Sequence, residues 1–221
     1  MIRMLLAAAT GADYYATNYA NYERQNPAAK LEFYLGLIRK NVPARGRVFE
    51  LGVGMGKFLE LAAKEFDCGG ADPNAHGVAT TQDRVPKSVE VIVGSYQEIP
   101  ITPAPEAVVA WDVLEHLPDL DQGLAAIHAK LAPGGSLIAV VPVYDGPLGW
   151  LVHLLDKDPT HVSKFSRDAW LSALEANGFE IVERGGILRK LLFNRWYAHL
   201  TKPQWLLRPI GTALYFVARK I

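Results

Sequence analysis

Cysteine is almost absent from this chain of 221 residues, in which Cys68 is the only one. A single cysteine excludes an intramolecular disulfide, and the lack of disulfides is typical of a cytoplasmic protein. Long apolar runs are absent too, since none approaches the roughly 20 residues of a membrane-spanning helix, and the run at 4–9 is too short for a signal peptide. Metal-ligand spacing is also missing, because no set of histidines and acids recurs on one helix face. We therefore predict a cytoplasmic protein without a metal site.

Net charge is absent as well, but the charges are distributed unevenly along the chain. The 23 basic and 23 acidic residues balance, yet no acid follows Glu183. The segment after it contains eight basic residues: Arg184, Arg189, Lys190, Arg195, Lys202, Arg208, Arg219 and Lys220. Six aromatic residues accompany the eight basic ones there, so a nucleic-acid partner is not expected. The composition favours a small or amphipathic molecule whose anionic group meets the basic tail.

Apolar residues recur at helical spacing within 188–200, among them Leu188, Leu192 and Trp196. With basic residues on the remaining positions, this pattern predicts an amphipathic helix. Such a helix either packs on its own domain or makes a peripheral contact with an anionic membrane surface. We favour the packed helix, because core packing is the commoner use of an apolar stripe.

The most informative segment is 47–59, which places a strand, a glycine-rich turn and a helix in succession. Apolar residues at 48–51 fit a short buried strand, and those from Phe58 onward recur at helical spacing. Gly52, Gly54 and Gly56 lie between the two elements. Glycine tolerates positive φ and lets a ligand approach the main chain, so this turn predicts a ligand cradle at the carboxyl end of the strand.

The spacing of the glycines and the acid before them indicate which ligand the cradle holds. A dinucleotide fingerprint requires a third glycine one residue later than Gly56. Glu50 would also repel a pyrophosphate but suits a cationic ligand. The pattern Glu50-x-Gly52-x-Gly54-x-Gly56 resembles motif I of the class I S-adenosylmethionine-dependent methyltransferases.

Further segments resemble the same family in the same order, over residues 46–183. Asp72, followed by Pro73, ends a second strand at 68–71, where an acid accepts the ribose hydroxyls of the cofactor. Ser95 and Tyr96 follow a third strand at 89–93 and match the adenine-contacting segment, although the family usually has an acid in place of Ser95. Asp112 follows a fourth strand at 107–110, and the resemblance makes it and Pro73 further candidate cofactor-binding residues.

The Glu115-His116 pair resembles the family's small-molecule branch, which includes quinone-biosynthesis methyltransferases. A Pro-Gly-Gly turn at 133–135 before a fifth strand at 136–141 is another mark of that branch. The resemblance implies an α/β fold, a Rossmann-like doubly wound sheet of seven strands with helices on both faces. The sheet is mostly parallel, with the last strand antiparallel.

The same resemblance divides the chain into an N-terminal helical cap at 1–45 and a methyltransferase domain at 46–221. We expect helices at 14–39, 119–131 and 166–177, with final strands at 179–183 and 212–218 separated by an insertion at about 185–211. Four tyrosines near the N-terminus either close over the cofactor or pack on the core: Tyr14, Tyr15, Tyr19 and Tyr22.

The resemblance implies methyl transfer from S-adenosylmethionine to a small or lipid-like acceptor by in-line displacement, with O-methylation the default. His116 and His161 are the candidate general bases, and His116 could instead order the turn at Glu115. Magnesium-dependent methylation of a catechol-like acceptor is not indicated. A binding protein that takes up S-adenosylmethionine without turnover is one alternative, and a nicotinamide-dependent oxidoreductase is a weaker one.

Overall fold

One mixed sheet of eight strands organises the residues that the computed structural model describes, 22–95, 97–156, 158–192 and 196–221. The spatial order is β3-β2-β1-β4-β5-β8-β6-β7. The strands are β1 (Arg47–Leu51), β2 (Asp67–Asp72), β3 (Glu90–Val93), β4 (Ala107–Trp111), β5 (Ser136–Pro142), β6 (Phe179–Leu192), β7 (Trp196–Leu200) and β8 (Ala213–Lys220). The first five are parallel, and β8 lies antiparallel between β5 and β6. The predicted fold class is confirmed, but the sheet has one strand more than expected.

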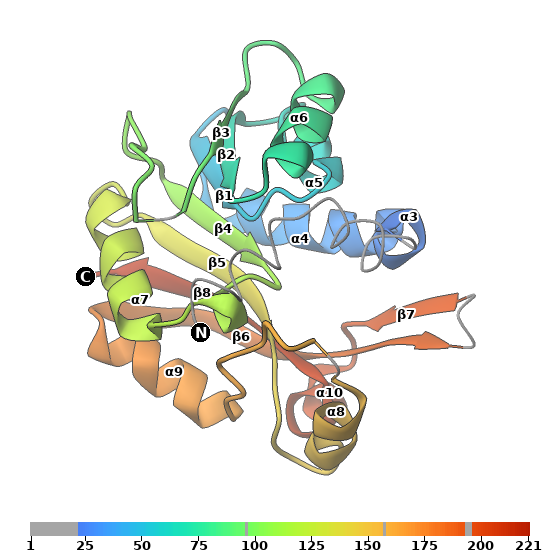
Figure 1. Ribbon diagram of the computed structural model, residues 1–221. Coiled ribbons are helices and arrows are strands. Elements are labelled where there is room, and N and C mark those ends of the chain that lie inside the picture. Colours follow the sequence, from blue (N-terminus) through green and yellow to red (C-terminus); the bar gives the residue numbers. More distant parts are fainter. Residues whose placement is uncertain (1–21, 96, 157, 193–195) are drawn as a thin grey trace.

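Helices cover both faces of this sheet (Figure 1). They are α3 (Tyr22–Gln25), α4 (Ala28–Asn41), α5 (Lys57–Ala62), α6 (Ala75–Arg84), the 3-10 helix η1 (Leu114–His116), α7 (Leu120–Lys130), α8 (Gly149–Leu155), α9 (Arg167–Ala176) and α10 (Gln204–Ile210). Apolar residues of α4 and α5 pack on one face, and those of α7 and α9 pack on the other.

Side chains along the central strands alternate strictly between the two faces of the sheet, and this alternation separates the two cores. In β5, Ile138 and Val140 contribute to the core under α4 and α5, whereas Leu137 and Ala139 contribute to the core under α7 and α9. All four side chains are fully buried. Because successive side chains of a strand point to opposite faces, a nearly continuous apolar run is what a strand buried on both sides requires.

Capping residues set the ends of the predicted helices as expected. The Asp119 side chain accepts a hydrogen bond from the Gln122 main chain before α7, and Ser166 accepts one from Ala169 before α9. Gly178, at φ 80°, follows α9 and begins the turn into β6. The first predicted helix is interrupted, because α3 ends at Gln25 and α4 starts anew after Pro27; residues 14–21 lie outside the described part.

The amphipathic helix expected at 188–200 is wrong, because this segment contributes to two strands. The outer half of β6 pairs with β7 in an antiparallel hairpin, with Leu188 opposite Leu200 and Leu192 opposite Trp196. Figure 1 shows this hairpin extending beyond the rest of the sheet. β6 is already paired with β8 up to Ile187, so continuing the strand overrides the local helical spacing. The interpretation as a contact with a membrane surface required an amphipathic helix at 188–200, so it no longer applies.

The connection beyond β7 contains α10, which leads back into β8. None of the helices in the described ranges combines the length and the apolar character needed to cross a bilayer. The segment predicted as an insertion therefore comprises the outer part of β6, all of β7 and α10.

Candidate functional site

The candidate site lies at the carboxyl edge of the parallel strands, where the strand order reverses between β1 and β4. β1 pairs with β2 on one side and with β4 on the other, so the carboxyl ends of all three strands meet at one edge. Glu50, Asp72 and Asp112 lie at these ends. In open α/β sheets this reversal point is where ligands bind.

The glycine-rich turn at 52–56 follows β1 as predicted. Gly52, Gly54 and Gly56 have φ angles of 73°, 55° and 78°, a region that side chains other than glycine rarely adopt. The main-chain N–H groups of Gly52 and Val53 both donate to the Ala71 carbonyl, at 2.8 and 3.2 Å. The turn is thereby fixed against the end of β2.

Asp72 is the hydrogen-bonding centre of this edge. Its two carboxylate oxygens accept from the main-chain N–H groups of Gly54, at 3.0 Å, and Asn74, at 2.8 Å. Burial raises the pKa of Asp72, and these two hydrogen bonds oppose that shift. The bonds orient the carboxylate, and each oxygen retains a lone pair for a further donor such as a ribose hydroxyl. Pro73, which lies between Asp72 and Asn74 in the sequence, is exposed.

Glu50 is buried at the end of β1, with 3 % of its surface exposed. Its Oε2 atom has no hydrogen-bond partner within the described residues. Burial, and to a lesser degree the neighbouring Asp72, raise the pKa of Glu50 well above its usual range. A cationic ligand at this edge would favour the ionised carboxylate, and this role of Glu50 stays a prediction.

The third predicted contact segment is only partly described. The Ser95 hydroxyl donates to the Glu98 carboxylate at 3.1 Å, while Tyr96 lies outside the described residues. The adenine contact of this segment stays a prediction.

Asp112 occupies a strained position after β4, with φ at 59°. Its Oδ2 atom accepts a hydrogen bond of 2.6 Å from the guanidinium of Arg189 on β6. Burial alone would raise the pKa of Asp112, but Arg189, with smaller contributions from Lys30 and His161, lowers it. Sequence reasoning missed this pair, because only the fold brings the basic tail to β4.

The N-terminal helices close on the glycine turn from outside the sheet. Tyr22 of α3 accepts a hydrogen bond of 3.2 Å at its hydroxyl from the main-chain N–H of Lys57, directly after Gly56. The Lys57 ammonium pairs with Glu23 at 2.6 Å. The other three tyrosines predicted to cover the cofactor, Tyr14, Tyr15 and Tyr19, lie outside the described residues.

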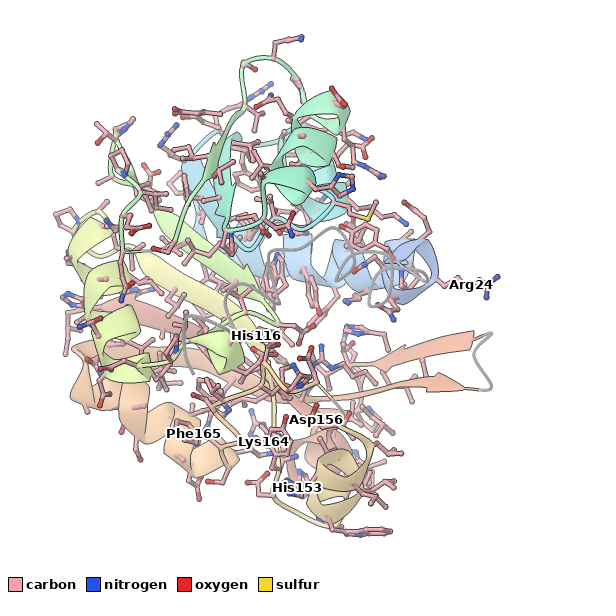
Figure 2. The ribbon with its side chains drawn as sticks, viewed as in Figure 1. Arg24, His116, His153, Asp156, Lys164 and Phe165 are labelled. Atoms are coloured by element: carbon pink, nitrogen blue, oxygen red, sulfur yellow. The ribbon has the colours of Figure 1, made fainter. Side chains whose placement is uncertain are left out.

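His116 and His161 come together although they lie far apart in the sequence. Their ring centroids are 4.7 Å apart. The main-chain N–H groups of Val162 and Ser163 both donate to the Glu115 carbonyl at 3.0 Å, so the loop after α8 docks on η1. Figure 2 labels His116 at this junction, with Asp156 and Lys164 below it in the view. The two candidate bases therefore belong to one cluster.

A polar network around Asp156 supports His161 from behind. Asp156 binds the Tyr144 hydroxyl at 2.6 Å and the Lys164 ammonium at 3.0 Å through Oδ2, and His161 Nδ1 at 3.0 Å through Oδ1. These contacts were not predicted, since no local pattern marks them. His153 is exposed on α8, and its ring centroid lies 6.0 Å from that of Tyr144.

The comparisons with known proteins agree with this geometry. A family model described as "Methyltransferase domain" matches residues 19–184. A trans-aconitate 2-methyltransferase of Variovorax paradoxus is 32% identical over 129 residues, which cover 56% of this chain and 48% of that protein. A second enzyme of that name, from Methylobacterium nodulans, is 29% identical over 182 residues, covering 73% of this chain and 68% of the relative.

Among solved structures, the complex between the Haloferax volcanii Trm112 methyltransferase activator and a methyltransferase matches with a TM-score of 0.70. The match is 16% identical and covers 97% of this chain and 96% of that one, so it concerns the fold. The fold and the glycine turn are those of a class I S-adenosylmethionine-dependent methyltransferase domain. The chain belongs to the family described as "Methyltransferase domain". It spans about half the length of the Variovorax relative.

Proposed function

We propose that this protein transfers the methyl group of S-adenosylmethionine to a carboxylate oxygen of a small polycarboxylic acid. The observation that carries the proposal is the ion pair between Arg189 and Asp112 at the carboxyl edge of the sheet, with the buried Lys30 as a second cation that acts electrostatically on Asp112. The two curated relatives, which are trans-aconitate 2-methyltransferases by name, support an acceptor with several carboxylates.

Charges around Asp112 favour an anionic acceptor. Lys30 is 6 % exposed, and burial lowers its pKa to about 8, with Asp112 opposing and Arg189 adding to the shift. Burial, Lys30 and Arg189 together lower the pKa of His199 to about 4, so this imidazole is neutral at pH 7. Lys30 and Arg189 both lower the pKa of Asp112, and a second cation acting on one carboxylate favours an anionic acceptor.

A carboxylate acceptor needs no general base, because it is already ionised at neutral pH. S-adenosylmethionine, when bound, supplies a methyl group on a positively charged sulfur, which a carboxylate oxygen receives as the carbon–sulfur bond breaks and S-adenosylhomocysteine leaves. The protein's contribution is alignment, which can lower a barrier by roughly 7 to 11 kcal/mol. Proton removal by His116 or His161 is not required for this acceptor.

The cofactor side of the proposal assigns a role to each residue of the sheet edge. The glycine turn admits the cofactor close to the main chain, and Asp72 accepts the ribose hydroxyls. Glu50 faces the cationic part of the cofactor, and Ser95 and Tyr96 contact the adenine. Asp112 lies between the cofactor and the acceptor, held by Arg189.

Formation of a methyl ester distinguishes this proposal from methylation of an amine or a phenol. Incubation with S-adenosylmethionine and a panel of di- and tricarboxylic acids should produce S-adenosylhomocysteine together with a methyl ester that alkali hydrolyses. Mass spectrometry before and after alkali measures this. An alkali-stable methyl group on an amine or a phenol, with no ester from any carboxylic acid, would contradict the assignment. Binding of S-adenosylmethionine without turnover on the whole panel favours the alternative of a binding protein.

Arg189→Gln should raise KM for the carboxylic acid that the panel identifies as the acceptor by roughly tenfold to a hundredfold. An effect of this size is expected because the substitution removes one hydrogen bond to a charged group. The dissociation constant for S-adenosylmethionine should change little. Arg184→Gln is the matched control, since Arg184 is exposed on the same strand. Equal kinetic effects of the two substitutions would exclude a specific role for Arg189.

Glu50→Gln should stabilise the free protein and weaken S-adenosylmethionine binding by roughly tenfold or more. The folded-state pKa of Glu50 is raised, so its ionisation costs stability as pH rises above the unfolded-state value near 4.5. The gain from Gln should therefore be small near about pH 4 and grow toward pH 7. Urea unfolding across this range, with calorimetry for binding, measures both effects. A gain that shrinks as pH rises would refute the reasoning.

A further inference from the structure

Three potential metal ligands converge next to the acceptor end of the site. Glu115, His116 and His161 each offer one ligand atom, and these atoms lie within 4.8 Å of one another. Two of the residues come from η1 and the third from the loop that docks on it. Ligands from two separate segments leave no regular spacing along one helix face, so the sequence pattern did not reveal the cluster.

Glu115 is the unusual member of this cluster. Its side chain is 1 % exposed, and both carboxylate oxygens are without a hydrogen-bond partner among the described residues. A buried carboxylate with no partner is costly, and buried charges are normally paired or bound to a metal. The Glu115 main-chain carbonyl, and not its side chain, accepts the two hydrogen bonds that hold the loop.

Both imidazoles make their hydrogen bonds through Nδ1. His116 donates from Nδ1 to the Thr160 carbonyl at 3.2 Å, with the Thr160 hydroxyl at 2.9 Å from the same nitrogen. His161 uses Nδ1 toward Asp156 at 3.0 Å. A proton on Nδ1 of each ring leaves the Nε2 lone pair for a ligand, and metal-bound histidines typically make this kind of outer hydrogen bond.

We propose that Glu115, His116 and His161 bind one divalent transition-metal ion. Two imidazole nitrogens and one carboxylate suit zinc, cobalt or manganese, whereas magnesium and calcium prefer sites made of oxygen ligands. Metal–ligand bonds of about 2.0–2.2 Å require ligand atoms about 4 Å apart at most, so the three side chains converge slightly on binding. Asp158, with Oδ2 at 4.0 Å from His161 Nε2, adds a negative charge beside the site.

Such an ion would keep open coordination positions, because the protein supplies three ligands. η1 follows β4 directly, with Asp112 between the two elements, so the cluster lies on the segment that contains Asp112. An acceptor oxygen bound to the ion would be held for methyl transfer. This role depends on the proposed function, but binding of the ion does not.

Cobalt is a suitable probe, because its visible absorption reports its ligands. The full chain, stripped with a chelator, should bind one Co²⁺ with a saturable visible band, and Zn²⁺ should displace it. Glu115→Gln and His161→Gln should each weaken binding by at least about a hundredfold. His76→Gln, which removes an exposed histidine of α6, should leave it unchanged.

Circular dichroism verifies that each variant is folded, and if Glu115→Gln fails to fold, His161→Gln carries the test. The proposal is overturned if the stripped protein shows no saturable Co²⁺ band, or if the affinity survives both ligand substitutions. S-adenosylmethionine binding is measured on the same samples. Cofactor binding without metal binding would overturn the metal site and leave the proposed function standing. Metal binding without cofactor binding would overturn the proposed function and leave the metal site standing.

Discussion

Asp72→Ala should reduce the affinity for S-adenosylmethionine at least about a hundredfold. The substitution removes the acceptor for the ribose hydroxyls, and hydrogen bonds to a charged group contribute about 1.5–3 kcal/mol each. It also removes the acceptor that orients the N–H groups of Gly54 and Asn74. Calorimetric titration of wild type and variant with S-adenosylmethionine and S-adenosylhomocysteine measures the loss.

The control for this prediction is Asp83→Ala, which removes an exposed acid from the neighbouring helix α6. Its affinity should equal that of the wild type. The cofactor geometry would be wrong if the Asp72 variant, shown to be folded, bound within about threefold of the wild type.

Gly52→Ala should lower the free energy of unfolding by about 2–5 kcal/mol. The left-handed conformation at φ 73° costs a non-glycine residue about 1–2 kcal/mol. A Cβ atom there would also lie 2.4 Å from Cγ2 of Val113, and such overpacking typically costs about 1–3 kcal/mol. Urea unfolding followed by circular dichroism measures the change.

Two further variants separate strain from steric conflict. Gly134 has a similar φ of 70°, but a Cβ atom added there would have no neighbour within 4 Å, so Gly134→Ala should lose only the backbone part. Adding Val113→Ala to Gly52→Ala should recover part of the loss, relative to Val113→Ala alone. Equal destabilisation by the Gly52 and Gly134 substitutions would mean that the contact with Val113 is unimportant.

The parallel half of the sheet could be predicted from the sequence because its signals are local. Short apolar runs ending in Glu50, Asp72 and Asp112 mark strands buried on both faces, and the glycines between β1 and α5 mark a turn with positive φ. Asp119 and Ser166 predicted helix starts because a cap depends on neighbouring residues alone. The site edge followed, since parallel strands bring their carboxyl ends together.

The remainder depends on contacts between distant segments, which no local pattern contains. Apolar spacing at 188–200 fits a helix, but pairing of β6 with β8 determines a strand. Arg189 on β6 reaches Asp112 after β4 although β5 and β8 separate these two strands in the sheet. His161 meets His116 only because its loop is bonded to the Glu115 carbonyl. Sequence reasoning named both histidines but could not join them.

The most direct test of the cofactor assignment is calorimetric titration of the wild-type protein with S-adenosylmethionine, S-adenosylhomocysteine and NAD. We predict saturable binding of the first two at one molecule per chain and no measurable binding of NAD. Preference for NAD, or no binding of any of the three by folded protein, would contradict the assignment of the glycine turn, Glu50 and Asp72 to this cofactor.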